Sequence, residues 1–297
     1  MASFIMAGRG QAAFFVILST LLSLILPPVG LFSAAAIALI TLRISWQQGL
    51  LYTFLGSVVL AIVSYLLKQD APLGVIAGLI AWLPIVIFAT ILSQTGSWQR
   101  TLQALLAVTI LGVLLFHAYQ PEPEQFWEAT LGQLKPMLQE AYKLSSSEAD
   151  ELIRSMADWM TGVFIAAIAV TVALSLVLAR HWQAMLYNPG GFGEEFRQLR
   201  IGKVFALIIV ICIVLAIVMR SSIAIEILII AVAIFMLQGI ALVHSIVHQL
   251  EMKAGWLIAL YFLLFILLAQ MFVLLAAFGI IDNFVDFRRK LAKTDQQ

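Results

Sequence analysis

Long apolar runs fill most of the chain, and one polar stretch, from His117 to Met156, separates them into two groups. Uncharged runs of about 18 or more residues recur on both sides of that stretch. Each is long enough to carry an α-helix across about 30 Å of hydrocarbon with its backbone hydrogen bonds satisfied internally. Barrel strands would instead alternate apolar and polar residues. The pattern therefore predicts an all-α fold, a polytopic bundle of transmembrane helices.

Nine apolar segments are candidates to cross the membrane. They cover residues 12–26, 29–46, 49–67, 72–92, 101–117, 159–178, 204–219, 223–247 and 256–281. Pro27 and Pro28 break the helix between the first two, which predicts a hairpin. The chain is predicted to be one integral membrane domain. Its parts are a first span group at 12–117, a polar insert at 118–157, a second span group at 158–281 and a polar tail at 282–297.

The polar insert is acidic: residues 117–156 carry a net charge of −4, whereas the rest of the chain carries +5. Because basic loops stay in the cytoplasm, the insert is predicted to be extracytoplasmic and the amino terminus cytoplasmic. Apolar residues recur in the insert at helical spacing, which predicts an amphipathic helix lying on the membrane or against the outer rim of the bundle. These residues are Phe126, Leu131, Leu134, Leu138 and Tyr142.

The end of the insert carries a helix-start signal. Ser145 with Glu148, or Ser147 with Asp150, is typical of a capping box that opens the helix leading into the sixth span. The insert as a whole is interpreted either as a lid over a cavity or as a plain surface helix.

The number of spans conflicts with the charge at the carboxyl end. Nine crossings would put that end outside the cell, together with Arg288, Arg289, Lys290 and Lys293. Either one segment does not cross, or the basic cluster is tolerated outside because neighbouring acids offset it. The prediction is therefore eight to nine spans.

The composition of the chain excludes several classes of function. The chain is 63% hydrophobic and 11% charged, against about 45–50% and 25% in soluble proteins. A net charge of +1 with no basic face excludes nucleic acid as a partner. The single cysteine, Cys212, rules out an internal disulfide and a cysteine-based metal cage. We find no nucleophile elbow and no zinc-protease pattern, so we expect neither an enzyme nor a cofactor.

Three polar residues within the second span group are candidates to line a solute pocket: Glu226, Gln238 and Gln270. A charge at the bilayer centre costs about 2.5–3.5 kcal/mol, so Glu226 is expected to face inward. Alternatively, Glu226 pairs with Arg220 at the outer interface, and the two glutamines bond each other across the bundle.

A weaker hypothesis is a metal site on the eighth span. His244 and His248 have the i, i+4 spacing of paired metal ligands, with Glu251 close to one turn further on. The residue after His244 is Ser245 and not a glutamate, so the zinc-protease pattern is absent. The alternative is a hydrogen-bonded histidine pair at the cytoplasmic end.

Two segments are candidate docking surfaces for other membrane proteins. In the glycine-rich loop from Asn188 to Lys203, Phe192 and Phe196 share a helical face, with Arg197 and Arg200 off it. This arrangement fits an interfacial helix or a docking elbow, or else a plain connector. Ala34 and Ala38, four residues apart, would let another helix approach closely, either a partner's or one of this chain's own.

The chain resembles the YybS-like family of predicted bacterial membrane proteins. The likeness lies in the hairpin at Pro27 to Gly30 leading to Arg43, in Asn188 to Lys203, in Gln238 to His244, and in Gly279 to Asp282 followed by Asp286 to Arg288. Such proteins are distantly similar to the S components of energy-coupling-factor transporters, small helical bundles that enclose a solute and dock to a partner. The resemblance implies the bacterial cytoplasmic membrane.

Two functions follow as expectations. The first is a non-enzymatic inner-membrane bundle that binds or helps to transport a small solute. The second is a membrane scaffold or assembly factor that acts through protein contacts, with metal handling as a weaker third. The expected partners are the lipid bilayer, a small solute and other membrane proteins.

The predicted orientation can be tested by cysteine labelling. With Cys212 replaced by serine, a new cysteine in the insert is expected to react with a membrane-impermeant thiol reagent added outside intact cells, because the acidic insert is predicted to lie there. Labelling that occurs only from the cytosolic side would contradict this orientation.

Overall fold

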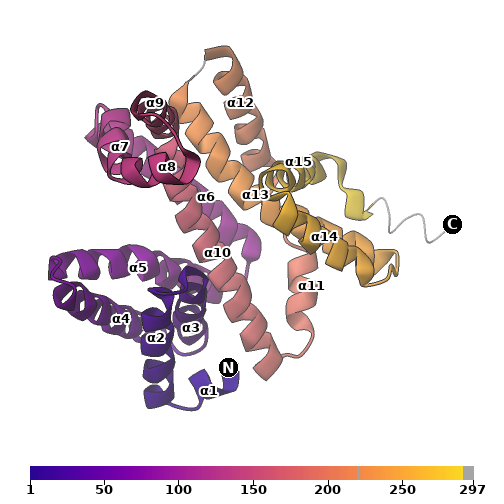
Figure 1. Cartoon of the computed structure of the whole chain (residues 1–297). Helices are drawn as coiled ribbons and strands as arrows, with labels where there is room; N and C mark the ends of the chain where they lie inside the picture. The colour runs from indigo at the N-terminus through magenta and orange to yellow at the C-terminus, as the bar shows by residue number, and fades with distance from the viewer. Residues whose placement is uncertain (220, 290–297) are drawn as a thin grey trace. The chain divides into compact units, whose positions relative to one another are not determined.

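The computed structural model describes residues 1–219 and 221–289, and every regular element in these ranges is helical (Figure 1). The chain forms two compact units, one of Met1–Ala104 and Val170–Leu199, the other of Leu105–Ala169 and Arg200–Gln297. The division falls inside two long helices, α6 (Trp98–Tyr119) and α10 (Met160–Tyr187), and not at the ends of the predicted span groups. Of the residues discussed above, Arg220, Lys290 and Lys293 lie outside the described ranges.

The first unit begins with a helical hairpin. Its elements, besides parts of α6 and α10, are α1 (Ala2–Met6), α2 (Arg9–Ser23), the 3-10 helix η1 (Pro27–Val29), α3 (Gly30–Arg43), α4 (Trp46–Leu66), α5 (Ala71–Thr95) and α11 (Gly191–Arg197). Pro27 and Pro28 lie in the first turn of η1, between α2 and α3. Helix α2 ends before the two prolines, which lack the N–H needed to continue it, and α3 follows and packs against α2, which confirms the predicted hairpin.

Helix α3 lies at the centre of the first unit. All residues from Ser33 to Thr41 are buried, so the helix is covered on every side. Helices α2, α4 and α5 pack against it. A helix that is apolar all round needs such surroundings, and the alanine-rich sequence of α3 lets its neighbours come close.

Helices α4 and α5 form a tightly packed pair because α5 presents glycines to α4. A Cβ atom on Gly74 would lie 2.5 Å from the carbonyl oxygen of Leu60, and one on Gly78 would lie 2.4 Å from the hydroxyl of Ser57. Any larger residue at Gly74 or Gly78 would force the helices apart.

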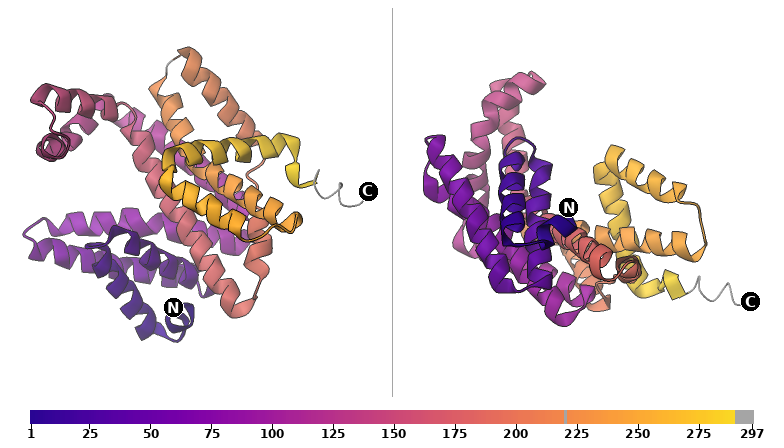
Figure 2. Two further views of the ribbon diagram at one scale, coloured as in Figure 1. Left: turned by 45° about the vertical axis from the view of Figure 1, so that its right-hand side comes forward. Right: turned by 90° about the horizontal axis from the view of Figure 1, so that it is seen from below.

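The second unit is built around one long buried helix. Besides parts of α6 and α10, it contains α7 (Pro123–Leu131), the 3-10 helix η2 (Gly132–Leu134), α8 (Lys135–Tyr142), α9 (Ser146–Ala157), α12 (Lys203–Met219), α13 (Ser222–Gln249), α14 (Gly255–Ile266) and α15 (Leu268–Val285). Helix α13 is the most buried of the six described helices that are long enough to span a membrane, and α12 and α15 pack on it (Figure 2).

Helices α13 and α15 touch at two glycines. A Cβ atom on Gly239 would lie 2.0 Å from the carbonyl oxygen of Leu275, and one on Gly279 would lie 2.4 Å from that of Phe235. Small residues at a helix crossing let the backbones meet, which increases van der Waals contact where the hydrophobic effect adds little.

The polar insert folds as three α-helices. Ser145 and Glu148 form the predicted capping box at the start of α9, and Lys135 pairs with Asp150 at 2.6 Å. Helix α9 ends at Ala157, so it does not run straight into α10. The predicted amphipathic face is partly uncovered, with Phe126, Leu134 and Tyr142 being 44%, 46% and 70% exposed. Of these three, Phe126 meets the ring of Phe116 on α6, with the ring centroids 5.6 Å apart.

Six of the described helices are long and apolar enough to cross a membrane: α4, α5, α6, α10, α13 and α15. The segments 9–23, 27–43, 203–219 and 255–266 are apolar but shorter, so the predicted eight to nine spans are not confirmed. The ninth predicted span, 256–281, is wrong as one helix, because it breaks at Leu267 into α14 and α15. The segment from Trp256 to Ile266 contains neither proline nor glycine, so nothing local announces this break.

Replacing Gly239 by alanine is expected to destabilise the protein by about 1–3 kcal/mol, because the new methyl group would meet backbone that cannot rotate away. Gly255→Ala is the matched control, since nothing lies within 4 Å of its added Cβ atom. Thermal unfolding in one detergent should show a lower midpoint for Gly239→Ala alone. Equal midpoints for the two variants would contradict the close crossing.

Candidate functional site

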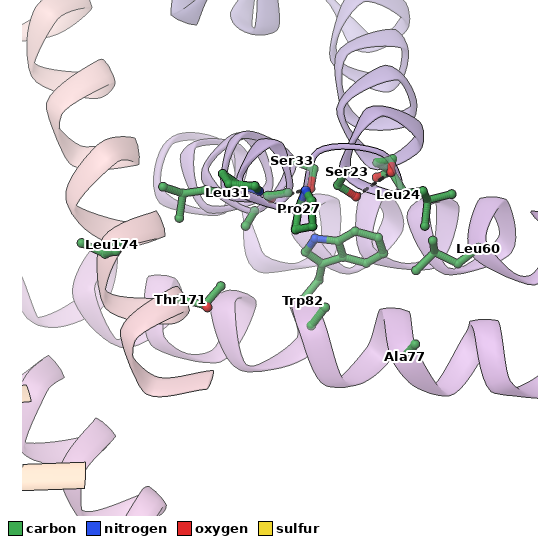
Figure 3. A pocket seen from close by; sticks show the side chains of 15 residues that line it. Ser23, Leu24, Pro27, Leu31, Ser33, Leu60, Ala77, Trp82, Thr171 and Leu174 are labelled. Carbon is green, nitrogen blue, oxygen red and sulfur yellow. Dashed lines mark hydrogen bonds between the residues drawn. The ribbon is translucent and has the colours of Figure 1, made fainter. Parts of the chain in front are cut away.

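A partly open cavity of about 540 Å³ lies in the first unit, beside the α2–η1–α3 hairpin (Figure 3). Its walls come from α2, η1, α3, α4, α5 and α10. The lining is mainly aliphatic, with the hydroxyls of Thr20, Ser23, Ser33 and Thr171, the indole of Trp82, and no charged side chain. Pockets for small molecules typically measure about 300–1,000 Å³ and combine apolar walls with a few polar groups.

One hydroxyl of the lining is left without a bond. Ser23 donates to the carbonyl of Thr20 at 2.6 Å, and Ser33 donates to that of Gly30 at 2.8 Å. The Thr20 hydroxyl is buried and has no hydrogen-bond partner among residues 1–219 and 221–289. A buried unpaired hydroxyl costs about 1–3 kcal/mol, so a bound molecule that pairs with Thr20 would recover that energy.

Trp82 forms the flat wall of the cavity, and α4 fixes where its ring lies. The side chain is 5% exposed. A Cβ atom on Gly56 of α4 would lie 2.7 Å from the Trp82 ring, so only glycine leaves room for the indole there. The sequence analysis missed the cavity because its walls come from six elements that only the fold brings together.

Glu226 does not line this cavity. Its carboxylate lies 2.8 Å from Nε2 of His117, at the end of α6, and is 2% exposed. The Thr161 side chain of α10 lies beside the carboxylate, and the Trp127 indole N–H donates to the Thr161 hydroxyl at 2.9 Å. As predicted, Glu226 points into the protein, and its described partners lie on α6 and α10. Sequence spacing could not connect it with His117, which ends a different span.

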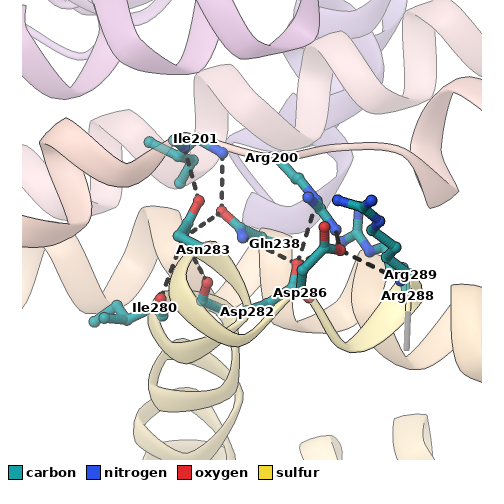
Figure 4. Close-up of polar contacts among 11 residues, drawn as sticks. Arg200, Ile201, Gln238, Ile280, Asp282, Asn283, Asp286, Arg288 and Arg289 are labelled. Atoms are coloured by element: carbon teal, nitrogen blue, oxygen red, sulfur yellow. Dashed lines mark hydrogen bonds and ion pairs between the residues drawn. The ribbon is translucent and has the colours of Figure 1, made fainter. Parts of the chain in front are cut away.

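Gln238 does not line the cavity either, because it belongs to a second polar cluster (Figure 4). The side-chain oxygen of Gln238 accepts a hydrogen bond from the backbone N–H of Ile201 at 2.9 Å. The side-chain oxygen of Asn283 accepts one from the backbone N–H of Gly202, also at 2.9 Å. The side-chain NH2 group of Gln238 donates a hydrogen bond to Asp282 Oδ2 at 3.4 Å. These bonds fasten the residues before α12 to α13 and α15.

The charges of this cluster surround a buried aspartate. Asp282 is fully buried, with Oδ2 3.6 Å from Arg200 Nε and 3.5 Å from Arg288 Nη2. Arg200 also pairs with Asp286 just beyond α15, and that hydrogen bond holds the pKa of the Asp286 carboxyl below its usual range. The charges are balanced within the chain, which favours a structural anchor over a ligand site, while Asp282 Oδ1 has no hydrogen-bond partner among the residues that the structure describes.

The remaining polar candidates fall in separate places. Gln270 lines a shallow groove with Ala269, Val273, Leu274 and Ala277, and the amide of Gln238 bonds Asp282 and not Gln270. His244 lies 2.9 Å from the hydroxyl of Tyr261, and Glu251 has left-handed backbone with φ 47° beyond the end of α13. Among the described residues, no group of three side chains of metal-ligand type gathers, so the chain does not join His244, His248 and Glu251 into one ligand set.

The docking candidates lie mostly against the chain itself. The predicted short helix is α11, which Arg180 fastens to α10 through an ion pair with Glu195 at 2.6 Å. Phe196 is buried, while Phe192 and Arg197 are half-buried. Arg200 belongs to the cluster around Asp282, and Ala34 and Ala38 are 2% and 0% exposed. The two alanines therefore serve internal packing, the alternative to partner docking.

These features define a multi-pass, all-helical membrane protein with a small cavity and two buried polar clusters. Residues 13–283 match a family described as predicted membrane protein (DUF2232), and the chain belongs to this family. No curated protein and no solved structure matches the chain. The likeness to transporter S components stays a prediction.

Removing the charge of Asp282 is expected to cost far more stability than removing that of Asp286. Asp282→Asn leaves buried arginine without its counter-charge, a change that typically costs about 3–5 kcal/mol. Asp286 is 37% exposed, so Asp286→Asn should cost at most about 1 kcal/mol. Thermal unfolding of the two variants compares their stabilities directly. Similar losses of stability would contradict the difference in burial between Asp282 and Asp286.

Proposed function

We propose that the protein is a non-enzymatic membrane protein that binds a small solute in the cavity of the first unit, as part of solute transport across the bacterial cytoplasmic membrane. The observation that carries this proposal is the cavity itself, with its buried and unbonded Thr20 hydroxyl. A volume of about 540 Å³ suits a molecule of metabolite size.

The lining indicates the chemistry of the solute. It contains no charged residue, so an ion would have to leave water without a counter-charge. The Trp82 indole offers a flat surface for a ring or an aliphatic chain. Ser23 and Thr171 are the least buried hydroxyl residues of the lining, and the unbonded Thr20 hydroxyl lies fully buried beside them. The favoured solute is therefore neutral and largely apolar, with one polar group.

The same lining favours binding over catalysis. The hydroxyls of Ser23 and Ser33 are bonded to carbonyl groups of nearby backbone, and no lining residue is a histidine, lysine or carboxylate that would activate them. A serine or threonine needs such a base to act as a nucleophile.

A scaffold or assembly factor is the second candidate function. The observation that favours it is the uncovered apolar face of the insert, where Met137 and Tyr142 are 67% and 70% exposed. Exposed apolar faces of this kind bind proteins or membranes. This role would need no cavity, which separates the two candidates.

Filling the cavity tests the first candidate. Ala77 lines it on α5, so Ala77→Leu should occupy part of its volume. Ala107→Leu makes the same change at an exposed position of α6 that does not line the cavity. Both variants are expected to keep the unfolding midpoint of the native protein.

The readout is mass spectrometry of small molecules released from protein purified in mild detergent. A low-mass species should accompany the native protein and Ala107→Leu, and its occupancy should fall at least about tenfold in Ala77→Leu, because one well-placed leucine removes the space for several ligand atoms. A species retained equally by all three proteins, or carried by none, would contradict the proposal.

A further inference from the structure

The pair of Glu226 and His117 differs from every other buried ion pair in the described part of the chain. Its carboxylate is 2% exposed, on a helix long and apolar enough to span the membrane. Its partner is a histidine, which is a cation only when it is protonated. The buried Asp282, by contrast, faces two arginines, which stay charged at any physiological pH.

Burial makes the charge of this pair depend on one proton. With one proton shared between Glu226 Oε2 and His117 Nε2, the pair is neutral overall, whichever atom holds the proton. Without that proton the pair is an isolated buried anion, and with a second one it is an isolated buried cation. Low-dielectric surroundings disfavour both of these states. The pair therefore favours the state that holds one proton.

The surroundings of the pair fix the carboxylate and leave a way out for the proton. The Thr161 side chain of α10 lies beside the carboxylate, and the Glu124 carboxylate of α7 is near enough for its charge to matter there. A Cβ atom on Gly162 would lie 2.6 Å from the Cα atom of Glu226, so α10 and α13 touch here and exclude water from one side. The His117 side chain is 15% exposed and the Glu226 side chain 2%, so His117 is the more accessible member of the pair.

The other helices packed on α13 bring no second counter-charge. Helix α12 carries Lys203 and Cys212, α14 carries Tyr261, whose hydroxyl lies 2.9 Å from His244, and α15 carries Asp282. Within the described ranges, none of these is among the groups that act on Glu226, which are His117, Thr161 and Glu124. His117 is thus the basic group whose protonation gives the ionised Glu226 carboxylate a counter-charge.

We propose that Glu226 and His117 together form a proton-binding site in the membrane domain, which exchanges one proton with solvent through His117. On release, the proton passes from His117 to water and the carboxylate stays ionised; on uptake, the reverse occurs. Thr161, held by Trp127, is a positioning residue that keeps the carboxylate aimed at the imidazole. This inference is independent of the cavity and of any solute.

Nitrogen-15 NMR of histidine-labelled protein in lipid nanodiscs tests the proposal. The chain has four histidines, and the His117 signal is the one that His117→Gln removes. In the native protein this signal should change from the protonated to the neutral form as the pH is raised over the range in which the protein stays folded. In Glu226→Gln, which keeps the shape but removes the charge, proton affinity at His117 should fall at least about tenfold.

Glu124→Gln is the control, because it removes a nearby carboxylate that does not bond His117. It should change the proton affinity less than about threefold, whereas Glu226→Asp should retain part of the native value. A His117 signal that stays in one form across the whole range would overturn the proposal, and this result needs only the native protein. Equal shifts in Glu226→Gln and Glu124→Gln would overturn it as well, since they would reveal a general effect of surface charge.

Discussion

Hydrocarbon offers no hydrogen bonds, and this constraint governs the structure. A polar group within a membrane-spanning helix must find its partner inside the protein or remain unpaired at a cost of several kcal/mol. Helix α13 shows the consequence, because it is the most buried of the six described helices that are long enough to span a membrane and carries both Glu226 and Gln238. Each meets partners from other helices, so the polar groups decide which helices must lie together.

The two buried polar clusters do different physical work. The one around Asp282 combines permanent charges with backbone N–H groups of Ile201 and Gly202, and it fastens three segments of the chain. The one at Glu226 relies on a histidine, whose charge can change. The cavity of the first unit contains neither kind of charge, since its lining is aliphatic apart from hydroxyl groups and one indole.

The sequence predicted the elements better than their contacts. Pro27 and Pro28 and the capping box at Ser145 act on their own neighbours, so local reasoning found them correctly. The partners of Glu226 and Gln238 come from segments 109 and 37 residues away in sequence, and no helical spacing reveals them. The break at Leu267 could not be predicted either, because no proline or glycine beside it marks the end of α14.

The central claim is that Gln238 and Asn283, buried on α13 and α15, hydrogen-bond to the backbone of the segment before α12. Hydrogen–deuterium exchange at Ile201 and Gly202 tests it most directly, because these amides precede α12 and lack helical partners of their own. Slow exchange in the native protein, lost when Gln238 and Asn283 are both replaced by alanine, is the result predicted. Exchange at the rate of an open loop in the native protein would contradict the account.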